Sequence, residues 1–170
     1  MSIASQWFAR MGAPLSPAER ARIDALLAAD PLLADAELDV VADWERALAF
    51  LRAADFDSTW WNHEEEERER LWHQALLRHT EDAIAERLAV VNAAVIDDIR
   101  RAAHAAALRV EFDDDVGIAE ATESATMAAH QCALATLAGE GDDHYFARKH
   151  ALFAAGRWPL GLHRGRYGVF

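Results

Sequence analysis

One face of a predicted helix between residues 116 and 138 mixes acidic, imidazole and apolar side chains. Its members recur at spacings of three and four and are Val116, Glu120, Glu123, Met127, His130, Leu134 and Leu137. A carboxylate on a face that packs against other helices needs a partner to offset its desolvation. Oxygen and nitrogen ligands together suit Zn, Fe, Mn or Ni. Glu120, Glu123 and His130 are therefore candidate ligands of a divalent metal.

Two further histidines occupy comparable positions on other predicted helices. His79 closes the apolar stripe of a helix expected over 62–79, and His150 lies between Phe146 and Phe153. A helical bundle could bring His79 and His150 to the same site. The alternative is structural, because acids are favoured near the start of any helix, and a core histidine can be satisfied by one hydrogen bond. Apart from this metal, no cofactor is expected.

The sequence motifs of common catalytic sites are missing. No Glu is followed by His three residues later and His-Glu-x-x-His is absent, which removes the main sequence argument for a di-iron bundle. Phosphate-loop, dinucleotide and nucleophile-elbow patterns are also absent. Cys132 is the only cysteine, so neither an internal disulfide nor a cysteine-based zinc site can form. We therefore assign no catalytic residue.

Aromatic and arginine residues gather in the segment 157–170 and at one point in the helical body. Those that could anchor a partner protein are Trp60, Trp61, Trp158, Arg164, Arg166 and Tyr167. Tryptophan, tyrosine and arginine are enriched at interface hot spots. In the alternative interpretation, tryptophan fills space that alanine leaves open between helices.

The run from His63 to Arg70 contains five glutamates and two arginines. Glu64–Arg68 and Glu66–Arg70 are spaced for ion pairs along a helix. The run is therefore predicted to form a solvated, salt-bridged face. It could also serve as an acidic docking surface for a basic partner.

Caps and apolar periodicity predict six helices and a small hairpin. Ser16, Pro17 and Glu19 form a capping-box start. The helices are expected over 16–30, 31–54, 62–79, 80–109, 116–138 and 142–156, with a hairpin of 160–163 and 166–170. The helix 80–109 has the most regular stripe and is expected to be the central strut. Whether it is continuous with 62–79 is left open.

The composition of the 170 residues bounds the classes of function. The formal net charge is −12 and the pI near 5.0, whereas binding to nucleic acid or to anionic membranes requires a basic surface. No signal peptide or membrane span is recognisable, so a cytoplasmic protein is expected. Alanine, leucine, arginine and glutamate favour helix. The fold expected is a single all-α bundle, with a lead-in over 1–15, a helical body over 16–156 and a basic aromatic tail over 157–170.

These features favour a non-enzymatic, acidic helical protein that binds a partner protein. An immunity-like, inhibitory or regulatory module fits the charge, because acidic surfaces steer basic partners. Homo-oligomerisation is also expected. The alternative is a metal-binding bundle or metal-dependent enzyme that uses His79, Glu120, Glu123, His130 and His150.

Overall fold

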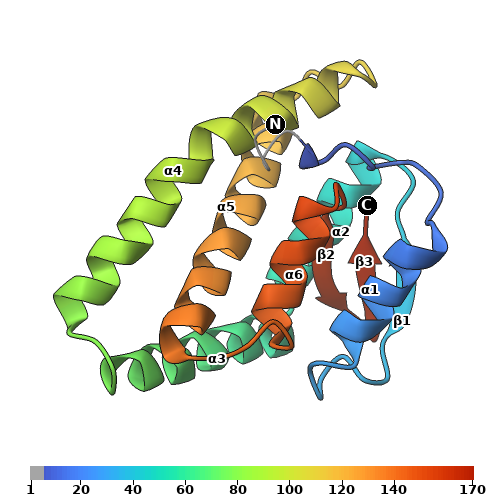
Figure 1. The fold of residues 1–170 in the computed structure, drawn as a ribbon. Coiled ribbons are helices and arrows are strands. Elements are labelled where there is room, and N and C mark those ends of the chain that lie inside the picture. Colours follow the sequence, from blue (N-terminus) through green and yellow to red (C-terminus); the bar gives the residue numbers. More distant parts are fainter. Residues whose placement is uncertain (1–5) are drawn as a thin grey trace.

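The computed structural model describes residues 6–170, so the first five residues of the predicted lead-in lie outside the described part. Within it the fold is mostly helical, as predicted (Figure 1). The helices are α1 (Pro17–Leu27), α2 (Trp44–Asp55), α3 (Ser58–Leu76), α4 (Glu81–Leu108), α5 (Asp115–Ala138) and α6 (Tyr145–Ala154). The strands are β1 (Glu37–Val40), β2 (Pro159–His163) and β3 (Arg166–Val169). None of the helices in residues 6–170 is long and apolar enough to cross a membrane.

Local caps explain several of the helix boundaries. Ser16 caps α1 in a reciprocal capping box with Glu19, as the sequence predicts. Thr80 caps α4 by accepting a hydrogen bond from the Ala83 amide, so α3 and α4 are separate helices. Asp57 caps α3, which therefore begins four residues earlier than predicted.

The helix expected over 31–54 is wrong in its first half. A turn follows Pro31, Glu37–Val40 forms strand β1, and only Trp44–Asp55 is helical, with Asp43 as its cap. β1 pairs in parallel with β3, so Glu37 lies beside Arg166. The partner strand is supplied by the far end of the chain, and helical spacing within 31–54 contains no information about it.

The predicted C-terminal hairpin is confirmed and forms most of a three-stranded sheet ordered β1-β3-β2. Arg164 and Gly165 join its strands, and both have positive φ, at 49° and 73°. Two consecutive residues of positive φ give the turn whose twist matches a two-residue hairpin.

The central helix is α5 rather than α4. The small side chains of α5, including Ala121, Ala125 and Ala128, are fully buried and allow α2, α3, α4 and α6 to contact it. Figure 1 shows α4 at one side of the molecule, next to α5. Val90 and Leu108 of α4 remain exposed, as expected for a flanking helix. The close approach that alanine permits decided which helix became central, not the regularity of an apolar stripe.

The tail joins two hydrophobic clusters. Trp158 and Leu160 belong to the cluster around α2, α4 and α5, while Leu162, Tyr167 and Val169 belong to the cluster around α1, α3 and α6. Each of these five side chains is buried. Most of the segment 157–170 is therefore part of the core, and only its turn at residues 164–166 is exposed.

Candidate functional site

The five predicted metal ligands do not converge. His79 lies in the turn between α3 and α4, and the His150 ring packs edge-on against Trp7 at 5.5 Å between centroids. Glu120 accepts two-pronged hydrogen bonds from Arg52 at 2.9–3.1 Å. His130 contacts Asn92. Among residues 6–170, no group of three or more His, Cys, Asp or Glu is arranged to hold a metal ion.

The predicted partner-binding residues divide into buried and exposed sets. Trp60, Trp158 and Tyr167 are buried core residues, so they are not exposed anchors. The Trp158 indole donates to Ser124 Oγ at 3.2 Å. Trp61 is 49% exposed, and Arg164 and Arg166 also lie at the surface.

A cavity of about 310 Å³ lies where α2, α3, α5, α6 and β2 meet, and we call it the acidic pocket. Four carboxylates line it, against two cationic side chains. The charged lining residues are Asp55, Glu64, Arg68, Glu120, Glu123 and Lys149. Two of the predicted candidates, Glu120 and Glu123, therefore do lie at one site, but beside cations and tryptophans rather than beside the predicted histidines.

The inner end of the acidic pocket holds a buried ion pair. Lys149 Nζ donates to Glu64 Oε1 at 2.6 Å and to Gln131 Oε1 at 3.2 Å. The Tyr145 hydroxyl donates to the same Glu64 oxygen at 3.1 Å. Burial is the main reason that the pKa of Tyr145 is raised, which keeps this phenol a neutral donor. The Glu64 carboxylate is thus held by donors from α6.

The outer part of the pocket contains carboxylates in excess. The side chains of Asp55 and Glu123 form no ion pair or hydrogen bond with another described residue. Protein atoms that displace water from the Asp55 carboxylate raise its pKa, and the negative charge of Glu64 adds to the effect. Asp55 therefore carries its charge at a cost that a bound cation would offset.

Tryptophans form an apolar wall of the pocket. The Trp60 side chain is buried against β2, where Gly161 has φ +103° and an added Cβ would lie 2.8 Å from the indole nitrogen. Trp61 remains half exposed, with the Arg68 guanidinium 5.6 Å from its ring centroid. Trp60 is therefore fixed in the wall, whereas the indole of Trp61 is accessible from solvent.

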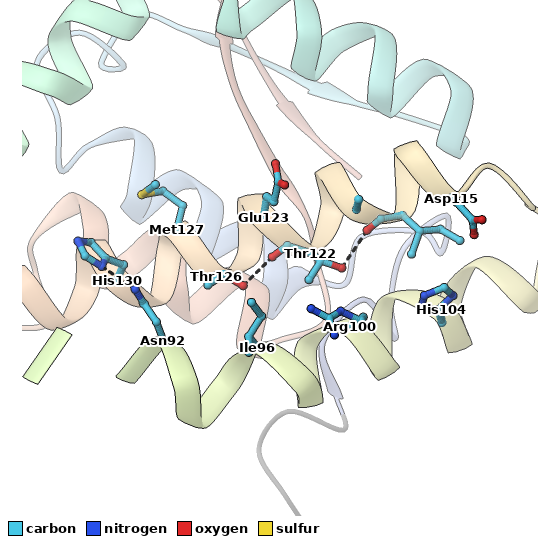
Figure 2. Close-up of a pocket in the computed structure, with 12 residues that line it drawn as sticks. Asn92, Ile96, Arg100, His104, Asp115, Thr122, Glu123, Thr126, Met127 and His130 are labelled. Carbon is cyan, nitrogen blue, oxygen red and sulfur yellow. Dashed lines mark hydrogen bonds between the residues drawn. The ribbon is translucent and has the colours of Figure 1, made fainter. Parts of the chain in front are cut away.

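A second cavity lies between α4 and α5, and we call it the α4/α5 groove. It has a volume of about 630 Å³ and a largely apolar lining (Figure 2). Glu123 and Met127 line both the groove and the acidic pocket. The face that the sequence identified on α5 thus separates the two cavities.

Asp55, Glu64 and Lys149 were missed as candidates from the sequence. The helical phase of α3 could have identified Glu64, because Trp60, Glu64, Glu67, Leu71 and Ala75 recur at spacings of three and four. The run 63–70 is therefore only partly solvated. Lys149, the only lysine in the chain, lies three residues after Phe146 and four before Phe153, on the buried face of α6.

Glu67 lies on the same face of α3 as Glu64 and is also paired there. Burial opposes ionisation of its carboxylate, but hydrogen bonds from Arg70 and His144 outweigh burial and lower the pKa of Glu67 to about 2. Glu64 and Glu67 thus both point toward α6 and its flanking turn. By contrast, Glu66 and Glu69 are exposed on the opposite side of α3.

No family model, no curated protein and no solved structure matches this chain.

Proposed function

We propose that this is a non-enzymatic binding protein that accepts a cationic side chain of a basic partner protein in the acidic pocket. The observation that carries the proposal is the pair of unpaired carboxylates, Asp55 and Glu123, in a cavity that also contains an accessible tryptophan. Both carboxylates are exposed to solvent, so a cation of a partner can reach them. Their attraction for that cation increases as the partner excludes water from the cavity. An indole face adds a cation–π contribution.

The other charges of the pocket are already engaged. Lys149 is bound to Glu64, Arg68 to Glu65, and Arg52 to Glu120. The charge of Lys149 favours the ionised form of Asp55, but no cation lies within ion-pair distance of Asp55 or Glu123. An anionic ligand would meet four carboxylates against two cations. The pocket therefore favours a lysine or arginine side chain.

The size and charge of the molecule favour a protein as the source of that side chain. A cavity of about 310 Å³ is at the lower limit of pockets for drug-sized ligands. The net charge of −12 would also accelerate association with a basic protein at low ionic strength. An inhibitory or regulatory module that covers a basic surface fits both properties.

Calorimetric titration with two matched peptides tests the proposal. Acetyl-Gly-Arg-Gly-amide should bind, whereas the same peptide with citrulline in place of arginine should not, because citrulline is isosteric and uncharged. Glu123→Gln should weaken the arginine peptide by about fivefold, the upper range for one partly exposed charge pair. Glu86→Gln, an exposed position on α4 outside the pocket, should leave the affinity unchanged.

Equal binding of the two peptides, or an equal effect of Glu86→Gln and Glu123→Gln, would contradict the proposal. The acidic surface would then attract cations without a specific pocket.

The pH dependence of the same titration provides a second test. The pKa of Asp55 is raised above its ordinary value of 3.8, so on acidification Asp55 loses its charge before a solvated aspartate would. The loss of affinity for the arginine peptide on acidification should therefore set in at a higher pH than a solvated aspartate would produce. In Asp55→Asn this early fall should disappear. A fall of the same midpoint in both proteins would exclude Asp55 from the binding site.

A further inference from the structure

A cation of the chain itself lies over the accessible tryptophan of the acidic pocket. Arg68 follows Trp61 by two turns of α3, and its guanidinium carbon lies 5.6 Å from the centre of the indole ring. Long side chains of a helix point back toward its N-terminus, which lets Arg68 reach this ring. The indole that would attract the cation of a partner is thus already in contact with one.

Arg68 separates the acidic pocket from a neighbouring polar cavity of about 510 Å³, because its side chain lines both. It also reaches from α3 to α5, where its Nη1 lies 3.4 Å from Met127 Sδ. The side chain of Arg68 is only 18% exposed, although Trp61 beside it is 49% exposed. Arg68 therefore covers part of the pocket instead of extending into solvent.

The contacts that hold Arg68 in this position are weak. Its ion-pair partner is Glu65, one turn before it on α3, and the Glu65 side chain is 48% exposed. Exposed ion pairs contribute little to stability, and a thioether such as that of Met127 is a weak acceptor. Arg68 can therefore leave the ring at a small cost. The other cation of the pocket, Lys149, is buried and bound to both Glu64 and Gln131.

We propose that Arg68 is an intramolecular competitor for the acidic pocket and that Glu65 holds it over Trp61. A lysine or arginine of the partner binds as Arg68 moves away from the ring. The contact lowers the affinity for an isolated basic side chain, and so favours a partner that brings further contacts. This inference rests on the proposed function, since it concerns the same pocket and the same class of ligand.

Removal of Glu65 distinguishes this arrangement from general electrostatics. Glu65→Ala deletes a negative charge beside the pocket, so charge alone predicts weaker binding of acetyl-Gly-Arg-Gly-amide. Because Arg68 loses its anchor, the variant should instead bind the peptide about threefold more tightly in calorimetric titration. Glu66→Ala removes the same charge from the opposite side of α3 and should not tighten binding. An affinity of Glu65→Ala equal to or below that of wild type would overturn the proposal.

A double variant tests whether Glu65 acts through Arg68. Arg68→Met removes the competitor and should tighten binding of the peptide by about fivefold, the upper range for one partly exposed charge pair. In that background Glu65→Ala should weaken binding, because only the loss of negative charge remains. A gain from Glu65→Ala that persists without Arg68 would overturn the assignment of the competitor.

Fluorescence tests the contact without a ligand. The difference between each protein and its Trp61→Phe counterpart isolates the emission of Trp61. Acrylamide should quench this emission more strongly in Glu65→Ala than in wild type, because Arg68 no longer covers the ring. Unchanged quenching would overturn the proposal whatever the peptide does.

The two titrations also separate this inference from the proposed function. If Glu123→Gln weakens the peptide but Glu65→Ala does not tighten it, the competitor is refuted and the pocket remains the binding site. If the peptide binds to none of the proteins, the proposed function fails, and the role of Arg68 as a competitor fails with it.

Discussion

Two regions of this protein gather charged side chains, and they differ in whether the charges are matched. In the first, Arg157 is 1% exposed and donates to Glu19 at 2.8 Å and to the carbonyls of Ala13 and Pro14 at 2.7 and 2.9 Å. In the second, the acidic pocket, Asp55 and Glu123 have no ionic partner among the described residues.

The electrostatics of the two regions differ in the same way. The hydrogen bond from Arg157 is the largest reason that the pKa of Glu19 falls well below its ordinary range. The pKa of Asp55 is shifted in the opposite direction. Glu19 and Arg157 link α1 to the start of the tail, whereas Asp55 and Glu123 line a cavity. In the structural cluster every charge is therefore paired. In the candidate site, unpaired carboxylates line a cavity.

The largest effect should come from breaking the saturated cluster. Arg157→Met would leave the Glu19 carboxylate buried without its main partner, and it should lower the free energy of unfolding by about 3–5 kcal/mol. Urea unfolding measures the change. Arg166→Met provides the control, because Arg166 is exposed in the same tail and its ion pair with Asp39 should contribute less than about 1 kcal/mol. If both variants lost the same free energy of unfolding, the buried pair of Arg157 would contribute no more to stability than the exposed pair of Arg166.

An intermediate effect is expected at the inner end of the acidic pocket. Glu64→Gln removes the anion that holds the buried Lys149 ammonium, while Gln131 remains as an acceptor. The free energy of unfolding should fall by about 1.5–3 kcal/mol, the range for a hydrogen bond to a charged group. Thermal and urea unfolding of Glu64→Gln and of Glu66→Gln, an exposed neighbour, would measure it. A loss below that of Glu66→Gln would show that Lys149 does not depend on Glu64.

The smallest effect has the opposite sign. The raised pKa of Asp55 means that the folded state binds its proton more readily than the unfolded state, so above that pKa the ionised group destabilises the fold. Asp55→Asn should therefore raise stability by about 0.5 kcal/mol, a small value because the residue is exposed. The same variant should bind the arginine peptide more weakly. A variant that is less stable than wild type would place Asp55 with Glu19 among structural charges.

The sequence predicted most of the helices because their signals are local. The capping box at Ser16 and the apolar periods of α4 and α5 lie within single elements. β1 was missed because its partner β3 is far away in the chain. The buried face of α3 was missed because glutamates at 64 and 67 resemble a solvated surface unless their partners, Lys149 and His144, are known.

The candidate site was predicted only in part. Glu120 and Glu123 were identified because carboxylates on a helix stripe need partners, and both line the acidic pocket. The type of partner was not predicted, since helical spacing places residues on a face but does not say which side chains of other helices lie opposite. The metal site stays a prediction. The described residues contain no group of three or more potential metal ligands placed together.

By itself, the sequence determined the mostly helical class, the C-terminal hairpin and the acidic charge, because composition, caps and turn residues act over a few positions. The tertiary structure decided that α5 is central, that Trp158 and Tyr167 are core residues, and that Glu64 is paired while Asp55 is not. The physical reason is that burial and charge pairing depend on which distant residues come into contact, and in this chain those contacts join α3, α5 and α6 to the tail.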